Sequence, residues 1–536
     1  MEQQGNERGL EKDFEAEVLR EILRARVYQL ARRTPLELSP LLSAEWQNDI
    51  LIKREDLQPI FSFKIRGAAN KIAALAPGTA GVICASAGNH GQGVALAAQK
   101  LGIPARVVMP RTTPDIKIKA VARYGATVIL HGDHYSEASD FCEELAAKEG
   151  ATLVHPFDDL LVIAGQGTVG KEIFEDAPDV DVIFVPVGGG GLIAGIAAYI
   201  KALDPRIKLV GVEPSDSDAM TQSVEQGSRI SLETVGGFAD GVAVRRVGHL
   251  NYALAARFVD SFIRVSTDEI CSAIHDIYRA TRTIVEPAGA LSWAGAKFMI
   301  QREGWTGKRL VTINSGANMN FQRLQFAAAR ALTGAGLETL LAVRLSEEKG
   351  ALKEFCHKII AGKSISEFNY RSNGTCEAYI FLGIATPETR DRADLHASLG
   401  REGYWYLDLT GNELAKEHIR HLVGGRAPEA AGEELYSFVF PERPMALANF
   451  LAVISSRWNI SLFHYRSHGA DYGRVLIAFE MQAWEAAAFE QHLAVIGYAY
   501  TRETENPAYR LFLQAPRPFF QAAADLGMSM DGARPF

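Results

Sequence analysis

The chain has 536 residues, of which 47% are hydrophobic and 22% are charged, a balance typical of globular proteins rather than disordered ones. Its formal net charge of −8 argues against general nucleic-acid binding and against adsorption to an anionic membrane surface. The five cysteines are scattered and include no CxxC pair, which indicates reduced thiols of a cytoplasmic protein rather than a disulfide framework or a zinc site.

Two segments bear on location. Residues 1–20 are acidic and polar, so they resemble neither a signal peptide nor a transit peptide. Residues 182–200, VIFVPVGGGGLIAGIAAYI, form an uncharged run long enough to raise the question of a membrane span. Four successive glycines would destabilise one continuous helix, so we predict a strand, a glycine loop and a helix instead.

Between residues 49 and 330, short apolar segments alternate with amphipathic helical ones. Alternation of this kind predicts right-handed crossovers and an α/β fold whose parallel sheet is covered by helices on both faces. Ligands of such folds bind at the carboxyl ends of strands, so we expect the functional loops to follow strands. The strand candidates are residues 81–86, 105–110, 126–132, 152–156, 182–187, 208–213 and 309–315.

After residue 336 the pattern changes to a weak internal repeat. Its two copies are residues 347–371 and 441–466, each preceded by an alternating strand and followed by a strand, a helix and a strand. This order predicts two α+β ferredoxin-like units. Residues 424–434, GGRAPEAAGEE, have the composition of a linker between them.

The glycine run predicts an anion site, because backbone N–H groups and the positive end of a helix dipole together favour phosphate. A dinucleotide site is the alternative: residues 189–194 fit G-x-G-x-x-A, and Glu213 lies near the spacing expected of a ribose-binding acid. That alternative leaves Lys64 and the motif at residues 86–98 without a role.

Three further segments present polar groups at predicted loop ends. SAGNHGQGVALAA, residues 86–98, places small and polar residues at a helix start, more of them than helix capping alone requires. FSFKIRGAAN, residues 61–70, places Lys64 between two phenylalanines and a helix. INSGANMNF, residues 313–321, offers the Ser315 hydroxyl, and residues 237–244 and 285–290 are weaker loop candidates.

Together these segments supply two anion loops, one amine and one hydroxyl at the loops of one predicted parallel sheet. Pyridoxal phosphate has a phosphate, a carbonyl and a ring nitrogen, and would use all of them. The lysine would bond covalently to the carbonyl carbon while the glycine loop holds the phosphate.

In this order, FSFKIRGA, SAGNHGQG, VGGGG and NSGAN resemble the motifs of fold-type II pyridoxal-phosphate enzymes, and specifically of threonine dehydratases (threonine ammonia-lyases). The resemblance covers about residues 20–335, and the two repeats resemble the ACT-like regulatory domains of the long biosynthetic form. It implies a catalytic domain over residues 1–335, built of two subdomains with parallel sheets covered by helices. It also implies ACT-like domains over residues 338–410 and 434–506.

The resemblance also implies roles for single residues. Lys64 resembles the catalytic lysine that forms the Schiff base. The other cofactor contacts implied are Phe63 against the ring, Asn89 at the ring 3′-oxygen, Ser315 at the pyridine nitrogen, and a phosphate loop of Gly188, Gly189, Gly190, Gly191 and Leu192. The implied receiver of the substrate carboxylate is the loop of Ser86, Ala87, Gly88, Asn89 and His90.

Two positions depart from the family pattern. Gly91 stands where many relatives have alanine, which implies a looser substrate loop. Ala219 stands where relatives that bind a divalent cation have an acidic ligand, so we expect no metal.

The function implied is deamination of L-threonine to 2-oxobutanoate and ammonia in isoleucine biosynthesis, by a cytoplasmic homotetramer. Isoleucine as inhibitor and valine as counteracting ligand are implied near Tyr370 and Tyr465, which occupy matching places in the repeats. The alternatives are another enzyme of the same fold acting on L-serine, such as a serine dehydratase or racemase, a threonine synthase relative, an NAD enzyme, or a non-catalytic amino-acid sensor.

Overall fold

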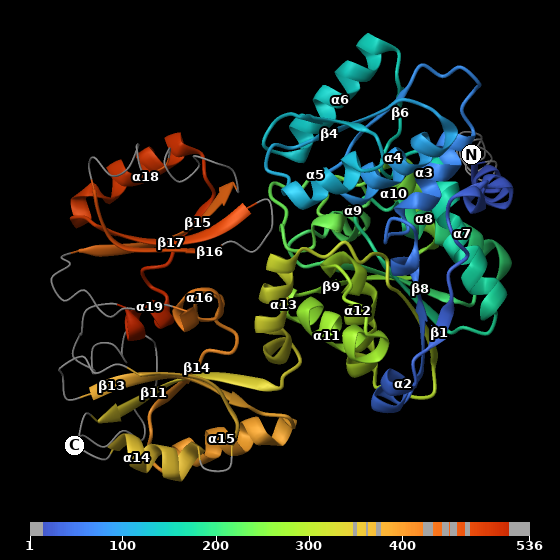
Figure 1. Cartoon of the computed structure of the whole chain (residues 1–536). Helices are drawn as coiled ribbons and strands as arrows, with labels where there is room; N and C mark the ends of the chain where they lie inside the picture. The colour runs from blue at the N-terminus through green and yellow to red at the C-terminus, as the bar shows by residue number, and fades with distance from the viewer. Residues whose placement is uncertain are drawn as a thin grey trace, which may run out of the picture. The chain divides into compact units, whose positions relative to one another are not determined.

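The computed structural model describes residues 14–346, 351–360, 363–370, 377–421, 432–441, 450, 458–466 and 472–513. The chain divides into two compact units (Figure 1), the first extending to Ala331 and the second beginning at Leu332. The first unit contains two mainly parallel sheets, and the second contains two antiparallel sheets.

The larger sheet of the first unit has six strands in the order β1-β2-β10-β7-β8-β9, and all neighbouring pairs except β1 with β2 are parallel. We call it the large sheet. Its strands are β1 (Leu36–Leu38), β2 (Asp49–Lys53), β7 (Val182–Pro186), β8 (Lys208–Pro214), β9 (Ser261–Val265) and β10 (Arg309–Ile313).

A second sheet, the small sheet, has four parallel strands in the order β5-β4-β3-β6. These strands are β3 (Val82–Ala85), β4 (Ala105–Met109), β5 (Thr127–Leu130) and β6 (Thr152–Leu153). All seven predicted strands form, but the expectation that the loops belong to one sheet is wrong. The four strands between residues 82 and 153 pair only with one another, while β10 returns to lie between β2 and β7.

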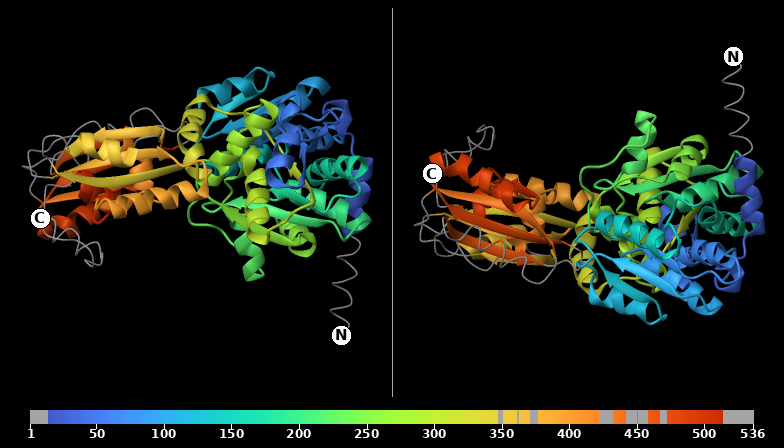
Figure 2. Two further views of the ribbon diagram at one scale, coloured as in Figure 1. Left: turned by 90° about the horizontal axis from the view of Figure 1, so that it is seen from below. Right: turned by 90° about the horizontal axis from the view of Figure 1, so that it is seen from above.

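Helices cover both faces of the large sheet, and its central strand β7 is accordingly apolar and buried at every position. In β7, Ile183 and Val185 face the core under α7, α8 and α10, whereas Val182 and Phe184 face the core under α11 and α12. Figure 2 shows helices on both sides of the strands. The helices up to residue 334, including those that pack on the small sheet described above, are α2 (Pro40–Trp46), α3 (Lys64–Ala73), α4 (Asn89–Leu101), α5 (Asp115–Ala122), α6 (Tyr135–Glu149), α7 (Leu160–Asp176), α8 (Gly191–Leu203), α9 (Ala219–Gln226), α10 (His249–Phe258), α11 (Thr267–Thr281), α12 (Pro287–Glu303) and α13 (Phe321–Gly334).

The apolar run at residues 182–200 forms β7, a glycine loop and α8, as predicted. In the part of the chain that the structure describes, no helix is both long enough and apolar enough to cross a bilayer.

The first repeat of the second unit has the predicted ferredoxin-like order, with its sheet arranged β12-β13-β11-β14. A short helix and a π-helical turn follow the first strand. The elements are β11 (Glu338–Ser346), α14 (Ala351–Phe355), η4 (Cys356–Ile360), β12 (Ile365–Tyr370), β13 (Glu377–Ala385), α15 (Thr389–Arg401) and β14 (Tyr406–Asp408).

The second repeat has the same strand arrangement, β16-β17-β15-β18. Its elements are β15 (Glu433–Pro441), β16 (Asn459–Arg466), β17 (Tyr472–Glu480), α18 (Ala486–Ile496) and β18 (Tyr500–Arg502). Most of the helix predicted after β15 lies outside the described residues, as do residues 424–431 of the linker. The linker prediction is wrong for Glu433 and Glu434, which begin β15 and pair with β17.

Each repeat ends in a helix that the sequence pattern did not predict, α16 (Glu413–Glu417) and α19 (Pro507–Phe512). Both helices lie between the two antiparallel sheets (Figure 1), and side chains of both sheets and both helices form one buried core. The helices begin at the capping residues Asn412 and Asn506, whose side chains are 3.3 Å apart. Residues 514–536 lie outside the described part of the chain.

Candidate functional site

The loop before α3 is held against the loop after β10. Phe61 has a left-handed backbone with φ of 56°, and Ser62 forms an isolated bridge with Gly316. The Phe63 amide then donates to the Ser315 carbonyl oxygen at 3.1 Å. These contacts fix Lys64 at the start of α3, beside the carboxyl end of the large sheet.

The amine of Lys64 points into the first unit. Its Nζ donates to the Pro156 carbonyl oxygen at 2.9 Å and lies 5.4 Å from the centre of the Phe63 ring. Burial lowers the pKa of Lys64 to about 8, against an opposing effect of the Glu286 carboxylate. The amine is therefore far easier to deprotonate than a surface lysine.

His90 lies in the first turn of α4 and is neutral. Burial, and secondarily the charge of Lys64, lower the pKa of His90 to about 3. Its Nε2 lies 2.8 Å from the Val154 carbonyl oxygen, so the ring proton resides there. Nδ1 is buried and has no hydrogen-bond partner among the described residues, which leaves an acceptor beside the loop at residues 86–90.

Of the four glycines after β7, the first three leave no room for a Cβ, and Gly191 is tightly packed. A Cβ on Gly189 would lie 2.3 Å from the Phe157 ring, and one on Gly188 would lie 2.8 Å from the Val242 backbone. Gly190 has φ of 91°, which favours glycine, and it caps α8. Asn251 Nδ2 donates to the Gly189 carbonyl oxygen at 2.7 Å, and this bond ties the glycine loop to α10. Backbone N–H groups therefore form the surface of this bend at a helix N-terminus. Leu192 follows them, buried in the first turn of α8.

Asn89 connects the two sheets of the first unit. Its Nδ2 donates to Glu286 Oε1 at 2.6 Å, and its Oδ1 accepts from Asn318 Nδ2 at 2.7 Å. Burial, with a contribution from Asp240, raises the pKa of Glu286 to about 7. A carboxyl group that titrates near neutrality therefore lies beside the amide.

The loop at residues 86–90 is folded around the Ser86 hydroxyl. Ser86 Oγ accepts from the backbone amides of Gly88 at 3.1 Å and Gly91 at 2.9 Å. A Cβ on Gly91 would lie 2.9 Å from Val107 Cγ1. The looser loop expected from Gly91 is thus not what the structure shows, because the glycine permits close packing on β4. Ala87 lies in the loop and is half-buried.

Ser315 directly follows the carboxyl end of β10 and is buried. Its Oγ donates to the Ala288 carbonyl oxygen at 3.2 Å, in the first turn of α12. The backbone bond to Phe63 therefore links Ser315 to the segment that carries Lys64.

Four residues of the site were missed by sequence reasoning. Glu286 lies in the segment at residues 285–290, which was singled out only weakly, and Asn318 lies in the segment at residues 313–321. Phe157 and Asn251 carry no motif signal, since their contacts with the glycine loop depend on the fold alone.

The dinucleotide alternative is not supported, because Glu213 is committed elsewhere. Its buried carboxylate accepts from the backbone amides of Met220 at 3.0 Å and Thr221 at 2.7 Å, at the start of α9. Among the described residues, no group of three or more His, Cys, Asp and Glu side chains is arranged to hold a metal ion.

Tyr370 and Tyr465 occupy equivalent positions on β12 and β16. Tyr370 is paired in register with Ile380, and Tyr465 is paired with Val475. Their side chains lie outside what the structure describes.

Comparison with known proteins agrees with these features. Residues 27–316 match the family "Pyridoxal-phosphate dependent enzyme", and residues 329–419 and 424–513 match the "C-terminal regulatory domain of Threonine dehydratase". The chain is 48% identical over 502 residues to the biosynthetic L-threonine dehydratase of Burkholderia multivorans, covering 92% of this chain and 99% of that protein.

Among solved structures, processed threonine deaminase isoform 2 of Solanum lycopersicum is 44% identical with a TM-score of 0.58, covering 60% of this chain and 94% of that one. Maize serine racemase is 33% identical with a TM-score of 0.54, covering 59% of this chain and 98% of that one. The chain therefore belongs to the family of biosynthetic threonine dehydratases, pyridoxal-phosphate-dependent enzymes with a C-terminal regulatory region.

Proposed function

We propose that this chain deaminates L-threonine to 2-oxobutanoate and ammonia, as the first step of isoleucine biosynthesis. The observation that carries the proposal is the placement of the Lys64 amine. It is buried, has a pKa of about 8, and is tied through Phe63 to Ser315. The curated relatives with the same two-part architecture are biosynthetic threonine dehydratases.

The residues present fit pyridoxal phosphate. The bend at residues 188–191, where a Cβ at Gly188 or Gly189 would collide with its neighbours, would receive the phosphate together with the Leu192 amide. Lys64 would bond covalently to the cofactor with Phe63 against the ring, Asn89 would face the ring 3′-oxygen, and Ser315 the pyridine nitrogen. When bound, the cofactor supplies an electron sink for the electrons released at the substrate α-carbon.

The protein's own groups perform the positioning and the proton transfer. The loop of Ser86, Ala87, Gly88, Asn89 and His90 lies at the N-terminus of α4, where backbone amides favour the substrate carboxylate. The freed Lys64 amine takes the α-proton, since a pKa near neutrality suits a general base. His90 stays neutral, because its pKa is lowered to about 3, and so it adds no second positive charge beside the Lys64 amine.

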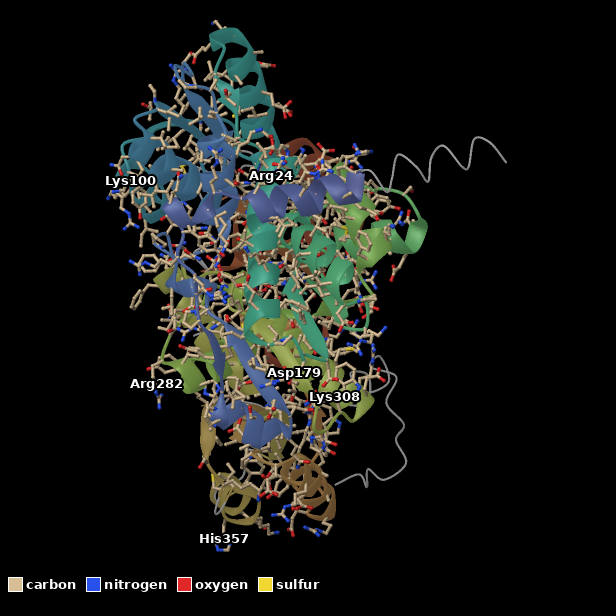
Figure 3. The ribbon with its side chains drawn as sticks, turned by 90° about the vertical axis from the view of Figure 1, so that its right-hand side faces the viewer. Arg24, Lys100, Asp179, Arg282, Lys308 and His357 are labelled. Carbon is tan, nitrogen blue, oxygen red and sulfur yellow. The ribbon has the colours of Figure 1, made fainter. Side chains whose placement is uncertain are left out.

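The test is Lys64→Ala, with Lys100→Ala as the matched control. Lys100 is exposed on α4 and extends from the surface (Figure 3). Release of 2-oxobutanoate from threonine should fall by about 10²–10⁴-fold or more in the Lys64 variant. The Lys100 variant should match the unsubstituted protein. A Lys64→Ala protein with full turnover would contradict the assignment.

An enzyme of the same fold acting on L-serine is the second candidate, favoured by the likeness to maize serine racemase. The match of the regulatory region to that of threonine dehydratase supports threonine instead. Parallel assays of 2-oxo acid release from both amino acids, together with chiral analysis of residual serine, separate the two.

We further propose isoleucine as the inhibitor and valine as the counteracting ligand, bound near Tyr370 and Tyr465. The equivalent register of the two tyrosines supports this. An inhibitor must bind two states of the enzyme unequally, so isoleucine should shift threonine saturation and valine should reverse the shift. Tyr370→Ala and Tyr465→Ala should weaken the response, whereas Trp484→Ala, which removes an aromatic side chain that is 78% exposed, should not.

The finer organisation is also proposed. The catalytic domain comprises residues 1–335, and the ACT-like domains comprise residues 338–410 and 434–506, which β11 at Glu338 and β18 ending at Arg502 support. The proposed oligomer is a homotetramer, and analytical sedimentation should give a mass four times that of the chain. A cytoplasmic location is supported by the described cysteines, which form no disulfide bond with one another: Cys84, Cys142, Cys271 and Cys356.

A further inference from the structure

Lys117 of α5 connects the two sheets of the first unit. The helix packs on the small sheet, since Val121 and Ile118 belong to the same core as β3 and β4. The Lys117 ammonium forms an ion pair with Asp240, which begins the short helix η3 (Asp240–Val242) between β8 and β9 of the large sheet. The pair therefore joins parts of the fold that share no strand pairing.

The Lys117 side chain runs along the proposed carboxylate loop. A Cβ built on Gly88 would lie 3.8 Å from Lys117 Cδ and 4.0 Å from Lys117 Nζ. Gly88 lies between Ser86, whose hydroxyl organises the loop, and Asn89, which begins α4. The ammonium group is thus adjacent to the backbone that would receive a substrate carboxylate.

Asp240 does not depend on Lys117 alone for charge compensation. Arg323 of α13 forms a second ion pair with Asp240, and its guanidinium also donates to the Gly237 carbonyl oxygen at 3.1 Å. The three side chains are largely sequestered, with exposures of 13% for Lys117, 19% for Asp240 and 3% for Arg323. Asp240 therefore stays paired with Arg323 when Lys117 changes partner, and Lys117 is the cation of the cluster that lies beside Gly88.

We propose that Lys117 is a specificity-determining residue that pairs with the α-carboxylate of the amino-acid substrate, exchanging Asp240 for it while Asp240 keeps Arg323. The inference rests on the proposed function, because it takes residues 86–90 as the carboxylate site. The bond from Lys117 to the substrate carboxylate replaces its bond to the Asp240 carboxylate, and both are charge-assisted hydrogen bonds. The exchange therefore costs little free energy. A neutral amide in its place cannot take Lys117 from Asp240.

The first test compares L-threonine with L-threoninamide, in which an amide replaces the carboxylate. Lys117→Gln should lower kcat/KM for threonine by about 10–100-fold, mainly through KM, and change kcat/KM for threoninamide by less than about threefold. Lys119→Gln, which removes an exposed lysine two residues along the same helix, should leave both values unchanged. Equal losses on both substrates in Lys117→Gln would overturn the proposal.

The second test measures binding without turnover. L-2-Aminobutanoate lacks the β-hydroxyl that is eliminated, so calorimetry on the holoenzyme reports its affinity directly. Lys117→Gln should weaken it by about tenfold or more, with little effect on L-2-aminobutanamide. Unchanged affinity for the carboxylate compound would also overturn the proposal, whether or not threoninamide is a measurable substrate.

Asp240→Asn separates substrate recognition from a merely structural ion pair. The variant removes the partner of Lys117 but keeps the ammonium group, so preference for threonine over threoninamide should stay within about threefold of the original. If the ion pair is only structural, Asp240→Asn will reproduce the Lys117→Gln defect, and the proposal fails. Failure of the proposed function would instead appear as an unsubstituted holoenzyme that releases no 2-oxobutanoate from threonine.

Discussion

Asn89 and Glu286 are 197 positions apart in the chain, yet the Asn89 amide donates to the Glu286 carboxyl group at 2.6 Å. The bond joins the start of α4, which packs on the small sheet, to the residue that precedes α12 on the large sheet. Asn89 also accepts from Asn318, so its amide orientation is fixed from both sides. The group proposed to face the cofactor ring is therefore held by both sheets at once.

The pKa of Lys64 predicts how the cofactor-free protein takes up pyridoxal phosphate. An amine adds to an aldehyde only when it is neutral, and burial lowers the pKa of Lys64 from 10.5 to about 8. The rate of incorporation should rise with pH and level off above about 8. Stopped-flow absorption across a pH series measures this. A rate still rising steeply near pH 10.5 would contradict the burial of the amine.

Glu286→Gln should move that profile. The Glu286 carboxylate raises the pKa of Lys64, so removing its charge should lower the midpoint of incorporation below that of the unsubstituted protein. The glutamine retains an oxygen that accepts from Asn89, which limits structural disturbance. The same stopped-flow series provides the measurement, and an upward shift of the midpoint would show that Glu286 does not act on Lys64.

Gly189→Ala should weaken cofactor binding. The added methyl group would meet the Phe157 ring at 2.3 Å, so the loop must shift and its N–H groups lose their alignment. We expect a loss of about 10–100-fold in affinity for pyridoxal phosphate, the effect of one or two charge-assisted hydrogen bonds. Gly400→Ala is the control, because a Cβ there meets no atom within 4 Å and the position is helical. Equilibrium dialysis of the two variants gives the comparison.

Glu172→Gln should destabilise the first unit. Glu172 pairs with Lys53 at 2.6 Å and Arg66 at 2.6 Å, and all three side chains are fully buried. Removing this buried charge takes away the ion-pair partner of Lys53, while Arg66 keeps its pair with Glu55, and the expected cost is about 3–5 kcal/mol. Glu175→Gln, on the same helix but in an exposed pair with Arg33, should cost no more than about 1 kcal/mol. Urea unfolding compares the variants.

The loss of stability in Glu172→Gln should depend on pH in a defined direction. Burial raises the pKa of Glu172, but Arg66 and Lys53 outweigh that effect and hold it below 4.5. The folded protein therefore binds this proton less readily than the unfolded chain, and the stabilisation is present above pH 4.5 and lost as pH falls through the lowered pKa. The difference in unfolding free energy between Glu172→Gln and the unsubstituted protein should therefore shrink in acid. A difference that widens as pH falls would contradict this.

Contiguous motifs were predictable from the sequence, and long-range contacts were not. Lys64 and the four glycines stand out because each motif combines unusual residues with a strand or helix boundary. Phe157 carries no such signal, and Glu286 lies in a segment with only a weak one. Their roles arise from contacts with Gly189 and Asn89 that only the folded chain creates. The division into two subdomains with separate sheets was implied by the family resemblance alone, because strand periodicity does not reveal that β10 inserts between β2 and β7.

The shared core between the two ACT-like copies has a consequence for how the enzyme senses its effectors. Since both copies belong to one polypeptide, their mutual concentration is set by the tether and stays high however far the protein is diluted. If the pair binds the proposed effectors, it is already assembled in each chain, and a change in response on dilution would report dissociation of the proposed oligomer rather than separation of the two copies.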